Sequence, residues 1–230
     1  MLRAKRKITR RELKKDPLLE ILFAVQKFYE RHRRLIRAAL LSGAIVGVVI
    51  LVALGRRSSV RHSAGELIAR GISRYNAGEM VAARDDFEAL VHDYPGTRPG
   101  RDAYFYLGKI YLDSDDDRAA KESFFEYVKK GENVFLKAAA LESLGNMARS
   151  DGEYEEAATL FLRAASLATF PFNQQQNKIY AAECWLKAGN REKARTVLNE
   201  LESAEDVHRV IRDQIEELSA YFDVVASRPT

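Results

Sequence analysis

Residues 104–124 read YFYLGKIYLDSDDDRAAKESF, and this stretch decides the fold. A small residue, Gly108, and Ala120 stand twelve positions apart, and the bulky Phe124 follows. Between the two small residues lies a turn-forming segment of aspartates and a serine, residues 113–115. Small side chains let two helices touch on either side of such a turn. The stretch therefore predicts a helical hairpin.

The same arrangement recurs every 37 residues. Three columns share this period: Gly71, Gly108, Gly145 and Ala182; Ala83, Ala120, Ala157 and Ala194; Phe87, Phe124, Phe161 and Leu198. A period between about 20 and 50 residues is typical of solenoids. We therefore predict an all-α solenoid of about four hairpins, at residues 64–99, 100–136, 137–173 and 174–202.

A last apolar stripe follows the repeats, in residues 203–230. It consists of Val207, Ile211, Ile215, Leu218 and Phe222, with charged residues outside it. Because a solenoid must cover its last open face, we predict a C-terminal capping helix followed by a tail.

Two units carry the fullest repeat pattern. The second has Tyr104, Leu107, Gly108, Tyr111, Ala120 and Phe124, and the third has Leu141, Leu144, Gly145, Tyr154, Ala157 and Phe161. This pattern resembles the tetratricopeptide repeat. The chain departs from it with a longer period and with Arg74, which stands where an aromatic residue is usual. The resemblance implies an inner groove, lined by the first helices of the hairpins, that binds other proteins.

The register of the repeat places twelve residues in this groove: Ile68, Ile72, Tyr75, Phe105, Lys109, Leu112, Glu142, Asn146, Arg149, Ile179, Glu183 and Leu186. Their apolar bias favours an extended or helical segment of another protein as the ligand. The family's carboxylate clamp is disfavoured, because Ile68 and Ile72 stand where it needs Lys and Asn. The alternative is that the twelve residues only pack a tight superhelix.

Residues 38–55 form a run without a charge. As a helix the run is about 27 Å long, enough to cross a bilayer. A buried core helix is the alternative, although such helices keep a polar stripe and only Ser42 is polar here. Ala39, Gly43 and Gly47 share one face of this predicted transmembrane helix, which suggests packing against another membrane helix.

The flanks of the run predict its orientation. Residues 1–37 contain thirteen Lys or Arg and four acidic residues, so their net charge is +9. Since the whole chain has a net charge of +4, the remaining residues have a net charge of −5. This bias predicts a cytosolic N-terminal tail, with an amphipathic helix after Asp16, and an uncleaved signal anchor rather than a cleaved signal peptide. Residues 56–63 are predicted to link the span to the folded domain. The negative remainder disfavours nucleic acid as a partner.

No motif for catalysis or metal binding is present. Cys184 stands alone in a predicted helix, which excludes a disulfide or a cysteine metal pair within the chain. The acidic run 113–117 resembles the start of a calcium loop, but Arg118 replaces its glycine and Phe124 its glutamate. The run fits a turn and helix cap instead. We expect a protein that is not an enzyme and needs no cofactor, metal or small-molecule substrate.

The layout of basic tail, span and repeat domain resembles the ancillary subunit of the bacterial Sec translocon. This resemblance implies a periplasmic adaptor at the inner membrane, with lipid and translocon, chaperone or envelope proteins as partners, acting in protein export or envelope-protein quality control. The alternative is a structural or assembly subunit of another membrane complex, in cytochrome maturation or cell division.

Overall fold

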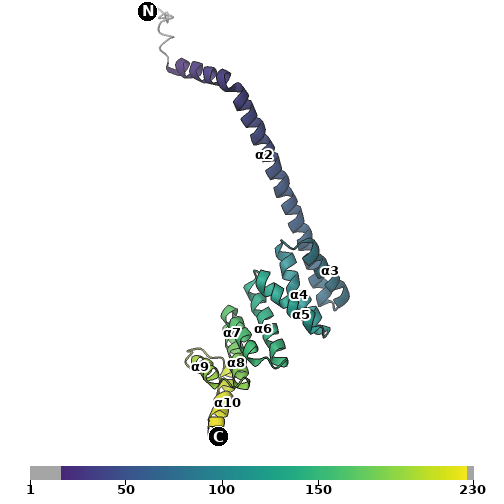
Figure 1. The fold of residues 1–230 in the computed structure, drawn as a ribbon, viewed down its shortest axis with the longest axis vertical. Helices are drawn as coiled ribbons and strands as arrows, with labels where there is room; N and C mark the ends of the chain where they lie inside the picture. Colours follow the sequence, from purple (N-terminus) through teal and green to yellow (C-terminus); the bar gives the residue numbers. More distant parts are fainter. Residues whose placement is uncertain (1–16, 227–230) are drawn as a thin grey trace, which may run out of the picture. The chain divides into compact units, whose positions relative to one another are not determined.

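The computed structural model describes the backbone of residues 17–226 and the side chains of residues 19–52 and 54–221. Over this part of the chain all regular structure is helical, as the repeat pattern predicts (Figure 1). The helices are α2 (Pro17–Asn76), α3 (Met80–Asp93), α4 (Arg98–Asp113), α5 (Asp117–Lys130), α6 (Val134–Ser150), α7 (Tyr154–Leu167), α8 (Pro171–Lys187), α9 (Arg191–Glu202) and α10 (Arg209–Ala226). Three predicted features lie outside the described part: the basic arm with its cap Asp16, the side chain of Phe222, and the last four residues.

The chain forms two compact units that divide between Ser59 and Val60. In the first unit, α2 presents its large apolar side chains to the exterior, with Leu41 67% and Leu51 70% exposed. An 18-residue window of this helix has a mean hydropathy of 2.6 and no buried side chain. By length and composition the helix can cross a membrane.

The predicted packing face of α2 is open among the residues that the structure describes. A Cβ atom built on Gly43 or on Gly47 meets no atom within 4 Å, and Ala39 is exposed. Packing of this face against another membrane helix stays a prediction.

The predicted linker, residues 56–63, is helical and belongs to α2. It holds neither proline nor glycine, and polarity alone does not end a helix. The ring of His62 lies 3.2 Å from the carboxylate of Glu66, one turn later. The segment that the sequence predicts as a link is thus part of α2.

Within each hairpin of the second unit, the small residue of the first helix meets the bulky residue of the second. A Cβ built on Gly108 falls 2.7 Å from the ring of Phe124, and the corresponding distances are 2.8 Å in the first hairpin and 3.0 Å in the third. In the fourth hairpin Ala182 stands for glycine and the smaller Leu198 for phenylalanine, so the added methyl has room. The four alanines of the second column are completely buried. The columns read from the sequence are thus the helix contacts.

The turns inside the four hairpins share one backbone conformation. Gly78, Gly152 and Gly189 have φ between 79° and 80°, in the left-handed region that glycine tolerates best. The corresponding residue of the second hairpin is Asp115, with φ 57°. Asp116 then caps α5, since its side chain accepts a hydrogen bond from the N–H of Ala119 at 3.1 Å. The acidic run is a turn and helix cap, as predicted.

Arg74, the departure from the repeat pattern in the first hairpin, takes part in an ion pair. Its guanidinium lies 2.7 Å from the carboxylate of Asp86 on α3, and Arg70 reaches the same carboxylate at 2.8 Å. Burial of Asp86 raises its pKa, but the hydrogen bonds and charges of the two arginines outweigh this and lower the pKa overall. A charge pair therefore replaces the usual aromatic contact.

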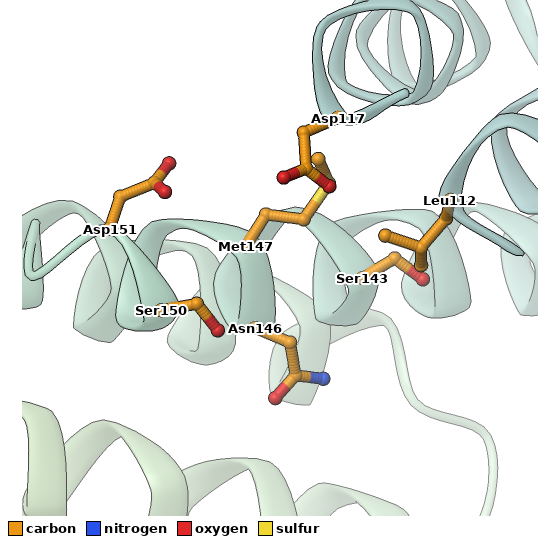
Figure 2. Close-up of a pocket in the computed structure, with 7 residues that line it drawn as sticks. All are labelled: Leu112, Asp117, Ser143, Asn146, Met147, Ser150 and Asp151. Atoms are coloured by element: carbon orange, nitrogen blue, oxygen red, sulfur yellow. The ribbon is translucent and has the colours of Figure 1, made fainter. Parts of the chain in front are cut away.

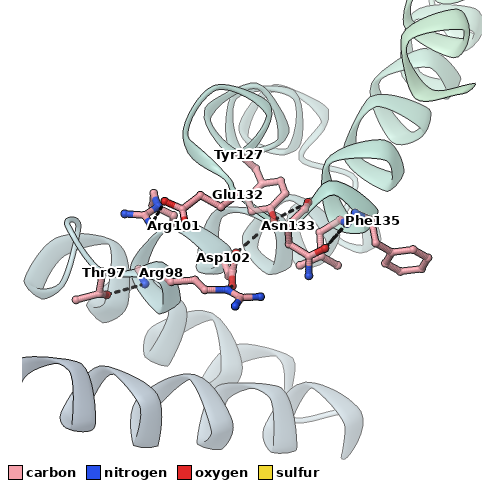
Figure 3. A network of polar contacts seen from close by, with 10 residues as sticks. Thr97, Arg98, Arg101, Asp102, Tyr127, Glu132, Asn133 and Phe135 are labelled. Carbon is pink, nitrogen blue, oxygen red and sulfur yellow. Dashed lines mark hydrogen bonds and ion pairs between the residues drawn. The ribbon is translucent and has the colours of Figure 1, made fainter. Parts of the chain in front are cut away.

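A polar network joins the second hairpin to the third at one edge (Figure 3). Asp102, on α4, accepts a hydrogen bond from the hydroxyl of Tyr127, on α5, at 3.3 Å and lies 3.4 Å from Arg98. Arg101 pairs with Glu132 at 2.6 Å in the loop that leads into α6. The hydroxyl of Tyr127 also lies 3.4 Å from the carbonyl oxygen of Asn133, which caps α6, so the network links the second hairpin to the start of the third.

The end of the solenoid is covered by α10, which contacts α8 and α9. Ile211 and Ile215 are buried, as the predicted capping stripe requires. The helix begins at Arg209 and not at residue 203, because the preceding residues form a turn held by Gln175. The amide of Gln175 donates to the carbonyl of Asp206 at 2.7 Å and accepts from the N–H of His208 at 3.1 Å.

Candidate protein-binding groove

The twelve predicted groove residues come from α2, α4, α6 and α8, three from each helix. They lie at equal positions of the repeat, at spacings of four and three residues. Ten of them are half-buried. The other two, Phe105 and Ile179, are buried.

Phe105 is part of the core and not of the groove surface on which its repeat position was expected to place it. Its ring lies 6.0 Å from that of Phe124 and 5.7 Å from that of Tyr127, both on α5. Ile179 is 0% exposed and belongs to the same core. The column of Phe87, Phe124, Phe161 and Leu198 is therefore not the whole of the hairpin core. That column leaves room at its edge, and long apolar side chains at this groove position fill it.

Several of the half-buried residues contact one another. The ammonium of Lys109 stands 5.5 Å from the ring of Tyr75. Arg149 donates to Asn146 at 2.9 Å and lies 3.9 Å from Glu183. Burial raises the pKa of Glu183, and the charge of Arg149 opposes the change. The predicted groove is therefore more polar and more internally paired than its apolar residues suggested.

A further column, which the sequence analysis did not identify, fills two of the junctions between hairpins. Tyr106 stacks on Phe87 of the preceding hairpin, with ring centres 4.9 Å apart, and meets Tyr75 edge-on at 6.0 Å. Tyr180, two periods later, packs against Phe161 at 5.3 Å and lies under Arg149 at 5.2 Å. The signal was available as the 37-residue spacing of positions 106, 143 and 180.

At the middle junction this column holds Ser143 instead of tyrosine, and a cavity of 270 Å³ is present. Figure 2 shows its lining residues, which come from α4, α5 and α6 and from the turn after α6. They are Leu112, Asp117, Ser143, Asn146, Met147, Ser150 and Asp151. The structure thus brings together two predicted groove residues, Leu112 and Asn146, around a gap that the other two junctions close with a ring.

A second cavity, of 450 Å³, lies between α8 and α10. Glu183 and Leu186 of the predicted groove line it, together with Lys187, Leu218 and Tyr221. Three groove residues remain: Ile68, Ile72 and Glu142. They line neither of the two cavities. Glu142 instead accepts a hydrogen bond from the amide of Asn177 at 3.4 Å.

No cluster of three possible metal ligands occurs among the described residues. The thiol of Cys184 is buried in the core, and this burial raises its pKa to about 11. A thiol that stays protonated near neutral pH is a poor nucleophile. Its surroundings therefore give Cys184 a packing role.

Comparison with known proteins identifies the repeat. The sequence profile of the tetratricopeptide repeat family matches residues 67–97, which span the first hairpin. The crystal structure of MamA protein is similar to this chain, with a TM-score of 0.50 and 18% sequence identity over 69% of this chain and 76% of that one. No curated protein sequence matches the chain. The chain therefore carries a tetratricopeptide repeat in its first hairpin and folds as a tetratricopeptide-like α-solenoid.

Proposed function

We propose that the chain is a membrane-anchored scaffold whose solenoid binds a segment of another protein. Repeats of this class are typically not enzymes, and their stacked hairpins present extended surfaces to partners. The observation that carries the anchoring is the apolar run of α2, which no described residue covers. A large exposed apolar surface requires a membrane or a protein partner.

The positive charge before the span supports a cytosolic N-terminus, with the solenoid on the opposite side, in the periplasm of a bacterium. A reporter that is active only outside the cytosol should therefore work when fused after Thr230 and fail when fused before Met1. The reverse pattern would reject this topology.

The function we propose is that of an adaptor in protein export or envelope-protein quality control. Its partners are proteins of the translocon, chaperones or envelope complexes. Purification of the full chain in mild detergent, with identification of the proteins that accompany it, tests this role. The test variant replaces Leu112 and Asn146 by alanine. Compared with the parent chain, it should lose partners without loss of helical content. If both chains recover the same partners, the groove is not the binding surface.

A structural or assembly subunit of another membrane complex is the second candidate. The bare face of Gly43 and Gly47 favours it, because small residues allow close approach of a second membrane helix. Replacing both glycines by leucine separates the candidates. Loss of the complex with this variant supports assembly through the span, and loss only with the groove variant supports the adaptor.

A further inference from the structure

We propose that the cavity between the second and third hairpins is a pocket for a lysine or arginine side chain of the bound protein segment. This inference rests on the proposed function, since it names the chemistry that the groove recognises.

The cavity exists because one ring is missing from a regular column. At the first junction Tyr106 covers Phe87, and at the third Tyr180 covers Phe161. Ser143 occupies the same repeat position at the middle junction, where its hydroxyl donates to the carbonyl of Ala139 at 3.0 Å. A serine leaves unfilled the space that a tyrosine ring takes elsewhere. The gap is therefore a feature of this junction, not of the repeat.

The walls combine an apolar floor with two carboxylates. Leu112 and Met147 supply aliphatic surface, and Asp117 and Asp151 supply negative charge (Figure 2). The salt bridges found among the described residues include neither Asp117 nor Asp151. Arg149 is on α6, which lines the cavity, but its guanidinium donates to Asn146 and pairs with Glu183. The cavity thus carries unbalanced negative charge.

Helix ends reinforce this charge. Leu112 is in the last turn of α4, and Asp151 caps the C-terminus of α6. The C-terminal end of a helix carries a partial negative charge that favours a cation. The N-terminal end of α5 also meets the cavity, but Asp117 stands in its first turn and Asp116 caps it. The net field around the cavity therefore favours a positive group.

The size of the cavity fits one side chain. At 270 Å³ it is slightly below the roughly 300–1,000 Å³ typical of sites for small molecules. Lysine and arginine each present an aliphatic stem with a charged head, which matches an apolar floor with carboxylates at the rim. An acidic side chain would meet repulsion, and a purely apolar one would leave both carboxylates without a partner.

The three methionines of the chain give a direct test. The full chain is labelled with ¹³C at its methionine methyl groups and placed in detergent micelles for NMR. The probes are capped five-residue peptides of alanine whose central residue is lysine, arginine, norleucine or glutamate. Met147 reports on the cavity, and Met80, in the first hairpin, is the internal reference.

We expect the lysine and arginine peptides to shift the Met147 signal in a saturable way and to leave Met80 unchanged. Replacing both Asp117 and Asp151 by asparagine should weaken this binding about tenfold, since each exposed charge contact contributes modestly. Ser143→Tyr should abolish it, because the ring that fills the other junctions then fills this one. Ser143→Ala is the matched control and should bind as the parent does.

Three results would overturn the inference: no shift of Met147 with the cationic peptides, an equal shift with norleucine, or binding that survives Ser143→Tyr. An unchanged helical circular dichroism spectrum of Ser143→Tyr shows that the variant is folded. If Met147 fails to respond while the full chain still recovers its partners, only this inference fails. If Met147 responds as expected while no partner is recovered, the pocket stands and the adaptor function fails.

Discussion

Glycine is used in opposite ways in the two units of this chain. In α2, the space around Gly43 and Gly47 is open to a distance of 4 Å. In the hairpins, Gly108 and Gly145 lie directly against phenylalanine rings. The hairpins therefore cover their own apolar residues, whereas no described residue covers the apolar run of α2. The same residue type thus meets opposite surroundings, and the comparison can be tested by matched substitutions.

The largest expected effect comes from a core ring. Phe124→Ala should lower the free energy of unfolding of the repeat unit by about 3–5 kcal/mol, because it removes a fully buried side chain and leaves a cavity. Val49→Ala, in the exposed run, should change it hardly at all. Urea unfolding of the full chain in detergent, followed by circular dichroism, measures both. Equal losses would show that the two units are stabilised together.

The second effect concerns the tight glycines. Gly108→Ala places a methyl group 2.7 Å from the Phe124 ring and should destabilise the unit by about 2 kcal/mol, despite the better helix propensity of alanine. Gly43→Ala meets open space and should cost nothing in the same unfolding experiment. A neutral result for Gly108→Ala would mean that the Phe124 ring can move aside freely.

The third effect depends on pH. The pKa of Asp86 is lowered in the folded chain, so its ion pairs contribute stability above the pKa of the unfolded chain, near 3.9. This stability should be lost as the pH falls from about 5 through the lower folded pKa. Asp86→Asn should remove about 1–2 kcal/mol at pH 7, because hydrogen bonds to charged groups are replaced by weaker ones. Urea midpoints measured between pH 3 and pH 7 should fall less steeply in the variant than in the parent.

The sequence predicted the solenoid well because its columns are direct contacts. A glycine, an alanine and a phenylalanine at fixed spacing report the one place where two helices touch, and each column proved to be buried. The capping stripe was equally readable, since Ile211 and Ile215 repeat with a helical period.

The groove was less predictable, because position in the repeat does not fix exposure. Phe105 occupies a groove column, yet its ring reaches the core beside Tyr127. The helical state of residues 56–63 also escaped prediction, since the polarity of a segment does not decide whether it is helical. The gap at Ser143 could have been seen as a break in the 106–143–180 column, but only the structure shows that tyrosine rings fill the other two positions.

The fourth effect separates two kinds of open glycine. Around Gly152, as around Gly43, a Cβ would meet no atom within 4 Å, but Gly152 has φ 80°. Gly152→Ala should therefore cost about 1 kcal/mol through backbone strain alone, where Gly43→Ala costs nothing.

The reverse change is available at Asp115, the only residue other than glycine with positive φ in the described part of the chain. Asp115→Gly relieves a strain of about 1 kcal/mol, but it also removes a negative charge near the start of α5 and frees the unfolded backbone. The net gain should be about 0.5 kcal/mol at most. Asp115→Asn removes the charge while keeping a side chain that tolerates this conformation, so the difference between the two variants isolates the backbone contribution. If Asp115→Gly is no more stable than Asp115→Asn in urea unfolding, the strain at this turn is no larger than the entropy that glycine adds to the unfolded chain. Glycine at the other three turns would then bring no gain in stability through φ.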